Sequence, residues 1–175
     1  MLIPVHKGLQ NLKVLVIDDD VITQRLLTDI LGKLGFTQIL SASNAYKGLE
    51  VLAKNEIDFI ISDWRMPGMS GIEFTRNIRA LPYSKNKFVN IIMLTGNAEI
   101  ENIIEARDAG VTEYLIKPFT IRDFCDRIIA IVENPREFVV TPTFQGPTRR
   151  RRNEPIPGGV ERRKIKPTPE KNIKG

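Results

Sequence analysis

The chain has 175 residues, of which 42% are hydrophobic and 27% charged, a composition typical of one soluble globular domain with or without a tail. No apolar run approaches the roughly 18 residues of a membrane span, the N-terminus lacks the apolar core of a signal peptide, and the single cysteine excludes an internal disulfide. The net charge of +5 is uneven, because residues 1–140 carry 16 Lys/Arg against 18 Asp/Glu and residues 141–175 carry 10 against 3. We therefore expect a cytoplasmic protein with a mildly acidic folded part and a basic tail.

Apolar runs alternate with helical patterns from about residue 13 to residue 134. The expected strands are residues 13–18, 37–42, 58–63, 89–95 and 112–116. The expected helices, several of them bounded by Asn, Gly or Pro signals, are residues 21–35, 44–55, 72–80, 98–110 and 120–134. Strands that are apolar throughout are typical of a parallel sheet with helices on both faces. The pattern therefore predicts a doubly wound α/β fold with five strands and five helices.

Polar residues follow the expected strands where each strand ends. Asp18 and Asp19 end the first strand, Asp63 the third and Thr95 the fourth, and Lys117 follows the fifth. In a doubly wound sheet these ends share one edge, where ligands bind. Carboxylate oxygens suit Mg²⁺, a central carboxylate can attack phosphorus, and an ammonium and a hydroxyl can bind phosphoryl oxygens. Each residue alone is also compatible with an ordinary turn, cap or surface position, but together they favour a metal and phosphoryl site.

Four segments in this order resemble the receiver domain of two-component response regulators: "VLVIDDD", "DFIISDWRMPGMSGIE", "IIMLTGNA" and "EYLIKPF". The resemblance covers about residues 10–134 and is closest to the single-domain chemotaxis-type (CheY-like) regulators. It implies a flavodoxin-like sheet with strand order 2-1-3-4-5. The expected organisation is an N-terminal extension at 1–10, a receiver domain at 11–135, and a Pro/Arg/Lys-rich tail at 136–175 that is largely disordered.

The resemblance also assigns roles at the site. Asp63 matches the phosphoacceptor, and Lys117 matches the lysine that pairs with phosphate and carboxylate. Asp18, Asp19 and Asp63 match the carboxylates that hold Mg²⁺, and Arg65 occupies the position whose backbone carbonyl completes the metal site. The expected cofactor is therefore Mg²⁺, and the expected partner is a sensor histidine kinase or a histidine phosphotransfer protein.

Two further residues match the switch of this family. Thr95 corresponds to the conformational-switch hydroxyl and Tyr114 to the aromatic side chain that swings inward on activation, although an aromatic residue in an edge strand is also compatible with simple packing. Ile103 is a candidate on the same partner face. The third acidic residue of the triplet, Asp20, has no chemical role in this pattern and is expected to cap the first helix.

These expectations favour a signalling protein rather than an enzyme. The first hypothesis is a phosphorylation-controlled switch, acting through the fourth helix, fifth strand and fifth helix on a protein partner, with chemotaxis or motility as a candidate process. The alternatives are a phosphate sink or relay intermediate, and a nucleic-acid-associated regulator acting through the basic tail. The run at 149–152, four arginines, is compatible with a solvated tail or with contact to nucleic acid, an anionic membrane or an acidic protein.

Overall fold

A computed structural model describes residues 8–81, 84–96, 99–141 and 144–148. The first described element is a short 3-10 turn, η1 (Leu9–Asn11), and a second, η2 (Lys85–Phe88), precedes the fourth strand. The strands are β1 (Lys13–Ile17), β2 (Gln38–Ala42), β3 (Phe59–Asp63), β4 (Asn90–Thr95), β5 (Glu113–Ile116), β6 (Phe138–Val140) and β7 (Gln145–Pro147). The helices are α1 (Val21–Leu34), α2 (Ala45–Lys54), α3 (Gly71–Ala80), α4 (Ile100–Ala109) and α5 (Ile121–Glu133).

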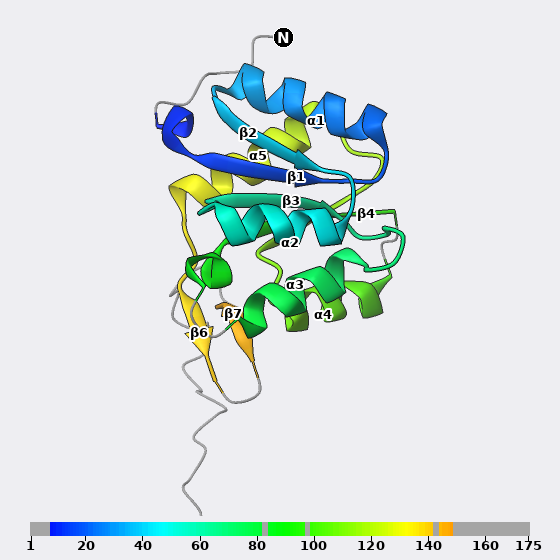
Figure 1. Ribbon diagram of the computed structural model, residues 1–175, viewed down its shortest axis with the longest axis vertical. Helices are drawn as coiled ribbons and strands as arrows, with labels where there is room; N and C mark the ends of the chain where they lie inside the picture. The colour runs from blue at the N-terminus through cyan, green and yellow to red at the C-terminus, as the bar shows by residue number, and fades with distance from the viewer. Residues whose placement is uncertain (1–7, 82–83, 97–98, 142–143, 149–175) are drawn as a thin grey trace, which may run out of the picture.

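The first five strands form one parallel sheet in the order β2-β1-β3-β4-β5. Helices α1 and α5 cover one face, and α2, α3 and α4 cover the other (Figure 1). Alternate residues of each central strand point to opposite faces of the sheet. In β1, Val14 and Val16 pack toward α1 and α5, while Leu15 and Ile17 pack toward α2 and α3. Because both faces are covered, these strands are apolar throughout. The predicted fold class and strand order are confirmed.

Short polar residues set the starts of four helices, as N-caps should. Asp20 accepts hydrogen bonds from the backbone N–H groups of Ile22 and Thr23, which confirms its expected role as the cap of α1. Asn44, Ser70 and Thr120 cap α2, α3 and α5 in the same way. These caps fix where each helix begins relative to the strand before it.

The burial of apolar side chains differs between α1 and α5. Ile22 and Leu26 lie at helical spacing with the core residues of α1, but their side chains are 77% and 52% exposed. Only the remaining stripe of that helix, led by Leu27, enters the core. Cys125 in α5 is buried, as expected for an apolar packing residue.

The segment after α5 departs from the expected tail, because β6 and β7 form an antiparallel hairpin packed against the receiver. The side chains of Val139 and Val140 are exposed. Phe138 makes the contact instead, against Phe88. The expectation of disorder for the rest of the tail, and most of the expected N-terminal extension, fall on residues outside the described ranges. Within those ranges, no helix is long and apolar enough to cross a membrane.

Candidate functional site

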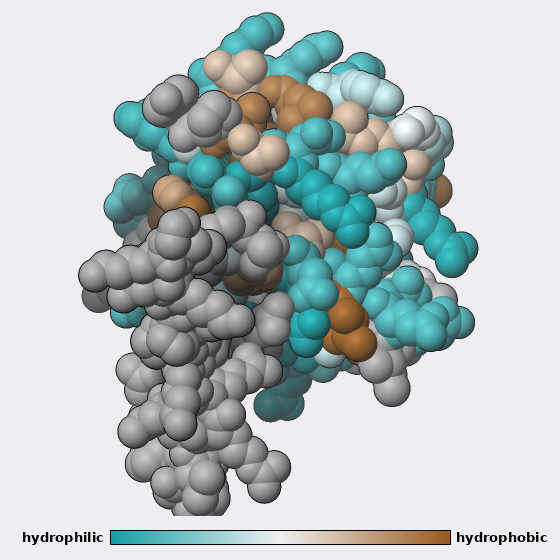
Figure 2. Space-filling view, turned by 90° about the horizontal axis from the view of Figure 1, so that it is seen from below, coloured by the Kyte–Doolittle hydropathy of each residue, from teal (hydrophilic) through white to brown (hydrophobic). Residues whose placement is uncertain are grey.

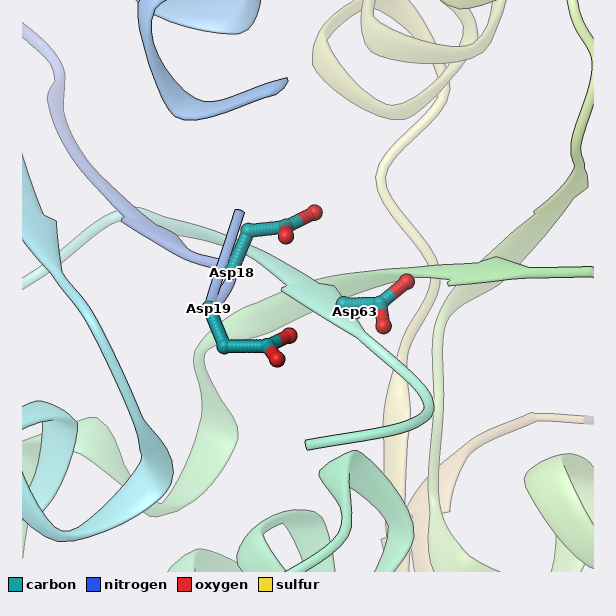
Figure 3. A group of neighbouring side chains, drawn as sticks. All are labelled: Asp18, Asp19 and Asp63. Atoms are coloured by element: carbon teal, nitrogen blue, oxygen red, sulfur yellow. The ribbon is translucent and has the colours of Figure 1, made fainter. Parts of the chain in front are cut away.

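The carboxyl ends of β1 and β3 bring three carboxylates together. These strands are paired in register, with Ile17 opposite Ser62, so that the residues following each pair lie side by side. One carboxylate oxygen from each of Asp18, Asp19 and Asp63 lies within 4.8 Å of the other two. All three side chains extend from the strand ends to the same side (Figure 3). The predicted acidic cluster is therefore present.

Lys117, the residue after β5, contacts two of these carboxylates. The Lys117 Nζ atom lies 2.6 Å from Asp63 Oδ1 and 3.3 Å from Asp18 Oδ2. The Lys117–Pro118 peptide bond is cis. Burial lowers the pKa of Lys117, but the hydrogen bond and charge of Asp63 outweigh it and the pKa is raised. Lys117 is therefore a fixed cation beside the central carboxylate.

The cluster carries more negative charge than this one ammonium neutralises. Asp18 is 2% exposed, and burial raises its pKa in spite of a hydrogen bond from the Asp20 backbone N–H and the nearby charge of Lys117. A raised pKa means that ionised Asp18 is disfavoured where it stands. A divalent cation held by hard oxygen ligands relieves such a strain, so the donor set fits Mg²⁺.

Two neighbouring loops complete the edge of the sheet. The Arg65 backbone N–H donates to Asp63 Oδ2 at 3.1 Å, while the Arg65 side chain is exposed. Thr95 is the last residue of β4 and is buried. Its carbonyl oxygen accepts a hydrogen bond from the Lys117 backbone N–H at 2.7 Å. The structure therefore places Thr95 at the end of the strand next to β3, and Arg65 in the loop that directly follows Asp63.

The two residues expected on the switch face also lie together, away from the carboxylates. Ile103 of α4 and Tyr114 of β5 line one groove of about 160 Å³, with Ala106 beside them. Both side chains are half-buried. Tyr114 precedes Lys117 by three residues, so β5 connects this groove directly to the site.

Two positioning residues had no assigned role in the sequence. A Cβ atom on Gly71 would lie only 2.2 Å from the Asp63 carbonyl oxygen, so α3 can begin against the end of β3 that bears Asp63 only because this residue is glycine. In the sequence, the position of this glycine at the end of the turn-rich "PGMSG" loop could have indicated its role.

Gln24 of α1 donates to the carbonyl oxygens of Asp18 and Ala42, at 2.8 and 2.7 Å, and thereby ties the ends of β1 and β2 together. No sequence pattern pointed to it.

Comparisons with known proteins agree with this geometry. The family model of the response regulator receiver domain matches residues 14–129. The chemotaxis protein CheY-3 of Vibrio cholerae serotype O1 is 38% identical over 124 residues, which cover 71% of this chain and 94% of that protein. The chemotaxis protein CheY of Pseudomonas aeruginosa is 37% identical over 122 residues, which cover 70% of this chain and 97% of that protein.

Solved structures agree as well. The chemotaxis response regulator CheY4 of Vibrio cholerae superposes with a TM-score of 0.64 at 31% identity, over 69% of this chain and 98% of that one. A putative response regulator from Chloroflexus aurantiacus gives a TM-score of 0.64 at 29% identity, over 70% of this chain and 98% of that one.

A doubly wound sheet whose strand ends gather three carboxylates and a lysine defines a signal-receiver domain. The chain belongs to the response regulator receiver domain family, and its relatives include chemotaxis proteins of the CheY type. It is therefore a protein of two-component signalling.

Proposed function

We propose that the protein is a response regulator that accepts a phosphoryl group on Asp63 in the presence of Mg²⁺. The observation that carries this proposal is the convergence of Asp18, Asp63 and Lys117 at the carboxyl edge of the sheet. Among the three carboxylates, Asp63 makes the shorter contact with Lys117, at 2.6 Å against 3.3 Å for Asp18. Its side chain is only 12% exposed, which leaves one face for a donor to approach.

The transfer is a nucleophilic substitution at phosphorus. A carboxylate oxygen of Asp63 attacks the phosphorus atom of a phosphohistidine, the new O–P bond forms as the P–N bond breaks, and the imidazole nitrogen leaves with the electron pair and takes up a proton. Lys117 moves from the Asp63 carboxylate to the phosphoryl oxygens, where its ammonium offsets the added charge. The Thr95 hydroxyl supplies a second contact from the end of β4.

Asp18, Asp19, Asp63 and the backbone carbonyl of Arg65 would hold the Mg²⁺ ion. When bound, such an ion neutralises charge on the phosphoryl oxygens as they approach the carboxylates. The chain itself fixes the metal-binding residues: Gln24 holds the end of β1 through the Asp18 carbonyl oxygen, and Gly71 allows α3 to support the end of β3.

The donor in this proposal is a sensor histidine kinase or a histidine phosphotransfer protein. Exposed apolar side chains lie beside the site on the face covered by α1 and α5. Ile22 and Leu26 occupy the first half of α1, and Ile121, which is 49% exposed, begins α5 just after Lys117 and the cis proline. Apolar side chains exposed together mark surfaces that bind proteins. We infer that this rim receives the phosphohistidine-bearing helix of the donor.

The output in this proposal passes through α4, β5 and α5. Phosphoryl contacts to Thr95 and Lys117 shift a two-state equilibrium, and Tyr114 and Ile103 change the affinity of this face for a protein partner. The named relatives are chemotaxis proteins, which makes motility control the first process to examine.

The test is phosphorylation of purified full-length protein by a small acyl phosphate with Mg²⁺. We expect one acid-labile phosphate per chain by intact-mass measurement and none after Asp63→Asn. The matched control is Asp29→Asn, which changes an exposed carboxylate on α1 and should be labelled like the natural protein. Equal labelling of Asp63→Asn would show that the phosphoacceptor is a different residue.

A further inference from the structure

The C-terminal hairpin, defined as the paired strands β6 and β7, lies outside the part of the chain that matches the family model, which ends at residue 129. It is nevertheless packed against the receiver, where β7 contacts α4. The contact is between backbones: a Cβ atom on Gly146 would lie 2.8 Å from the Cα atom of Gly110, the residue that ends α4. Likewise, a Cβ on Gly110 would lie 2.5 Å from the Gln145 carbonyl oxygen. Glycine on both sides allows this close approach.

An ion pair fixes the segment that leads into the hairpin. Arg136 lies 2.9 Å from the carboxylate of Glu113, the first residue of β5, and Arg127 of α5 lies 3.3 Å from the same carboxylate. The Glu113 side chain is only 7% exposed and that of Arg136 is 19% exposed. Because a hydrogen bond between two charged groups is stronger than one between neutral groups, this contact ties residue 136 to β5.

An aromatic contact holds the other side of the hairpin. The Phe138 ring packs edge-on against Phe88, with centroids 5.5 Å apart. The guanidinium carbon of Arg79 lies 5.0 Å from the Phe138 ring centroid. Arg79 also donates to the carbonyl oxygen of Gly110, so one buried cation joins the hairpin to the end of α4. This end of the molecule, seen from below, is mostly hydrophilic, with hydrophobic residues in small separate groups (Figure 2).

The hairpin also closes one side of the groove beside Tyr114. Arg136 and Pro147 line this groove together with Ile103, Ala106 and Tyr114 of the receiver. Four parts of the chain therefore meet around the Tyr114 side chain: α4, β5, β7 and the residue before the hairpin, Arg136. A change in the position of α4 or Tyr114 has to change the contacts of the hairpin, because close-packed groups do not deform continuously.

We propose that the C-terminal hairpin is an intramolecular latch that holds α4 and β5 in the conformation in which Lys117 pairs directly with Asp63, and that phosphorylation releases it. This inference rests on the proposed function of Asp63. The latch binds β5 at Glu113, four residues before Lys117, and it binds the end of α4 at Gly110. By thermodynamic reciprocity, if a phosphoryl group on Asp63 weakens the latch, then loss of the latch strengthens binding of a phosphoryl mimic by the same factor.

The Thr148 backbone N–H donates to the Glu137 carbonyl oxygen at 2.8 Å and closes the base of the hairpin.

The test uses full-length protein and beryllofluoride with Mg²⁺, a noncovalent mimic of the phosphoryl group, with affinity read from the fluorescence of Trp64 beside the site. Gly146→Ala forces the hairpin away from Gly110, and we expect its affinity for the mimic to rise by about fivefold or more, the lower range of allosteric couplings. The control is Gly32→Ala, where a Cβ atom meets nothing within 4 Å, and its affinity should stay unchanged. Arg136→Ala, which opens the latch from its other side, should act in the same direction as Gly146→Ala.

Hydrogen exchange of residues 136–148 provides a second readout. We expect the mimic to speed exchange in this segment in the natural protein and to leave it unchanged in Asp63→Asn. If the natural protein binds the mimic but neither latch variant changes its affinity and exchange is unaltered, the latch is wrong and the proposed phosphoacceptor stands. If the natural protein does not bind the mimic at all, both proposals fail.

Discussion

The two ends of the parallel sheet treat buried charge in opposite ways. At the carboxyl end, three carboxylates gather, the ammonium of Lys117 pairs with two of them, Asp18 and Asp63, and burial raises the pKa of Asp18. At the amino end, the guanidinium of Arg79 is 3% exposed and donates to the carbonyl oxygens of Gly110, Lys87 and Val89. Burial lowers the pKa of Arg79 to about 9, which still leaves it charged at neutral pH.

Asn86 follows the same principle at the amino end. Its side-chain amide donates to the carbonyl oxygens of Leu52 and Asn55 and accepts from the Ile57 backbone N–H, all within 2.9 Å. Here polar side chains satisfy loop backbone that would otherwise be buried without partners. The amino end is therefore arranged for stability. The carboxyl end retains uncompensated negative charge, which is what a site for a cation and a phosphoryl group requires.

The largest effect should come from the amino end. Arg79→Met removes a buried donor from three carbonyl oxygens, each of which then lacks its partner. Since an unsatisfied buried group costs about 1–3 kcal/mol, we expect a total loss of about 3–5 kcal/mol in the free energy of unfolding, measured by urea denaturation. The matched control on the same helix is Arg76→Met, which removes an exposed pair with Glu105 and should change stability by roughly 0.5 kcal/mol or less. Equal losses in the two variants would contradict the structural role of Arg79.

A smaller effect on stability, joined to a loss of function, should come from Gly71 at the carboxyl end. A Cβ atom there meets the Asp63 carbonyl oxygen at 2.2 Å and the Met93 sulfur atom at 2.8 Å. We expect Gly71→Ala to lower stability by about 1–3 kcal/mol and to slow labelling of Asp63, because the strand end must shift. Urea denaturation and the rate of phosphate incorporation measure the two effects. A variant that is destabilised but labelled at the normal rate would show that Gly71 supports packing alone.

The sequence predicted the carboxyl end far better than the amino end. Asp18, Asp63 and Lys117 follow apolar strands, and the parallel topology alone brings such residues to one edge. Arg79 gave no such signal, because an arginine in an amphipathic helix normally faces water, and its partners are carbonyl groups up to 31 residues away. A polar residue at the end of an apolar strand stands out in the sequence. A polar residue on the expected outer face of a helix, such as Arg79, does not, because that face normally carries polar residues.

The C-terminal hairpin was not predicted for a related reason. Its strands have three residues each, and Pro147 in β7 argues against a strand. What holds it is nonlocal: the approach of Gly146 to Gly110 and the contact of Phe138 with Phe88. Similarly, the exposure of Ile22 and Leu26 does not follow from helical periodicity, which cannot tell a core face from a binding face.

The carboxyl end makes the last and smallest prediction, on stability and Mg²⁺. Because burial raises the pKa of Asp18 above its ordinary value of 3.8, the folded protein holds a proton there after the unfolded chain has released it. Stability therefore falls as pH rises from 3.8 through the raised pKa, and the full penalty is present at neutral pH. Mg²⁺ at tenfold its Kd should return about 1.4 kcal/mol.

The most direct test of this account is the melting temperature of Asp18→Asn at neutral pH, with and without Mg²⁺. Asp20→Asn is the matched control, because asparagine also caps helices and Asp20 only caps α1. We expect Asp18→Asn to melt above the natural protein in metal-free buffer and to gain nothing from Mg²⁺, while Asp20→Asn keeps the full Mg²⁺ response. An Asp18→Asn variant that melts lower without metal and responds to Mg²⁺ like the natural protein would contradict the account. Asp18 would then not carry the uncompensated negative charge that Mg²⁺ neutralises at the carboxyl end of the sheet.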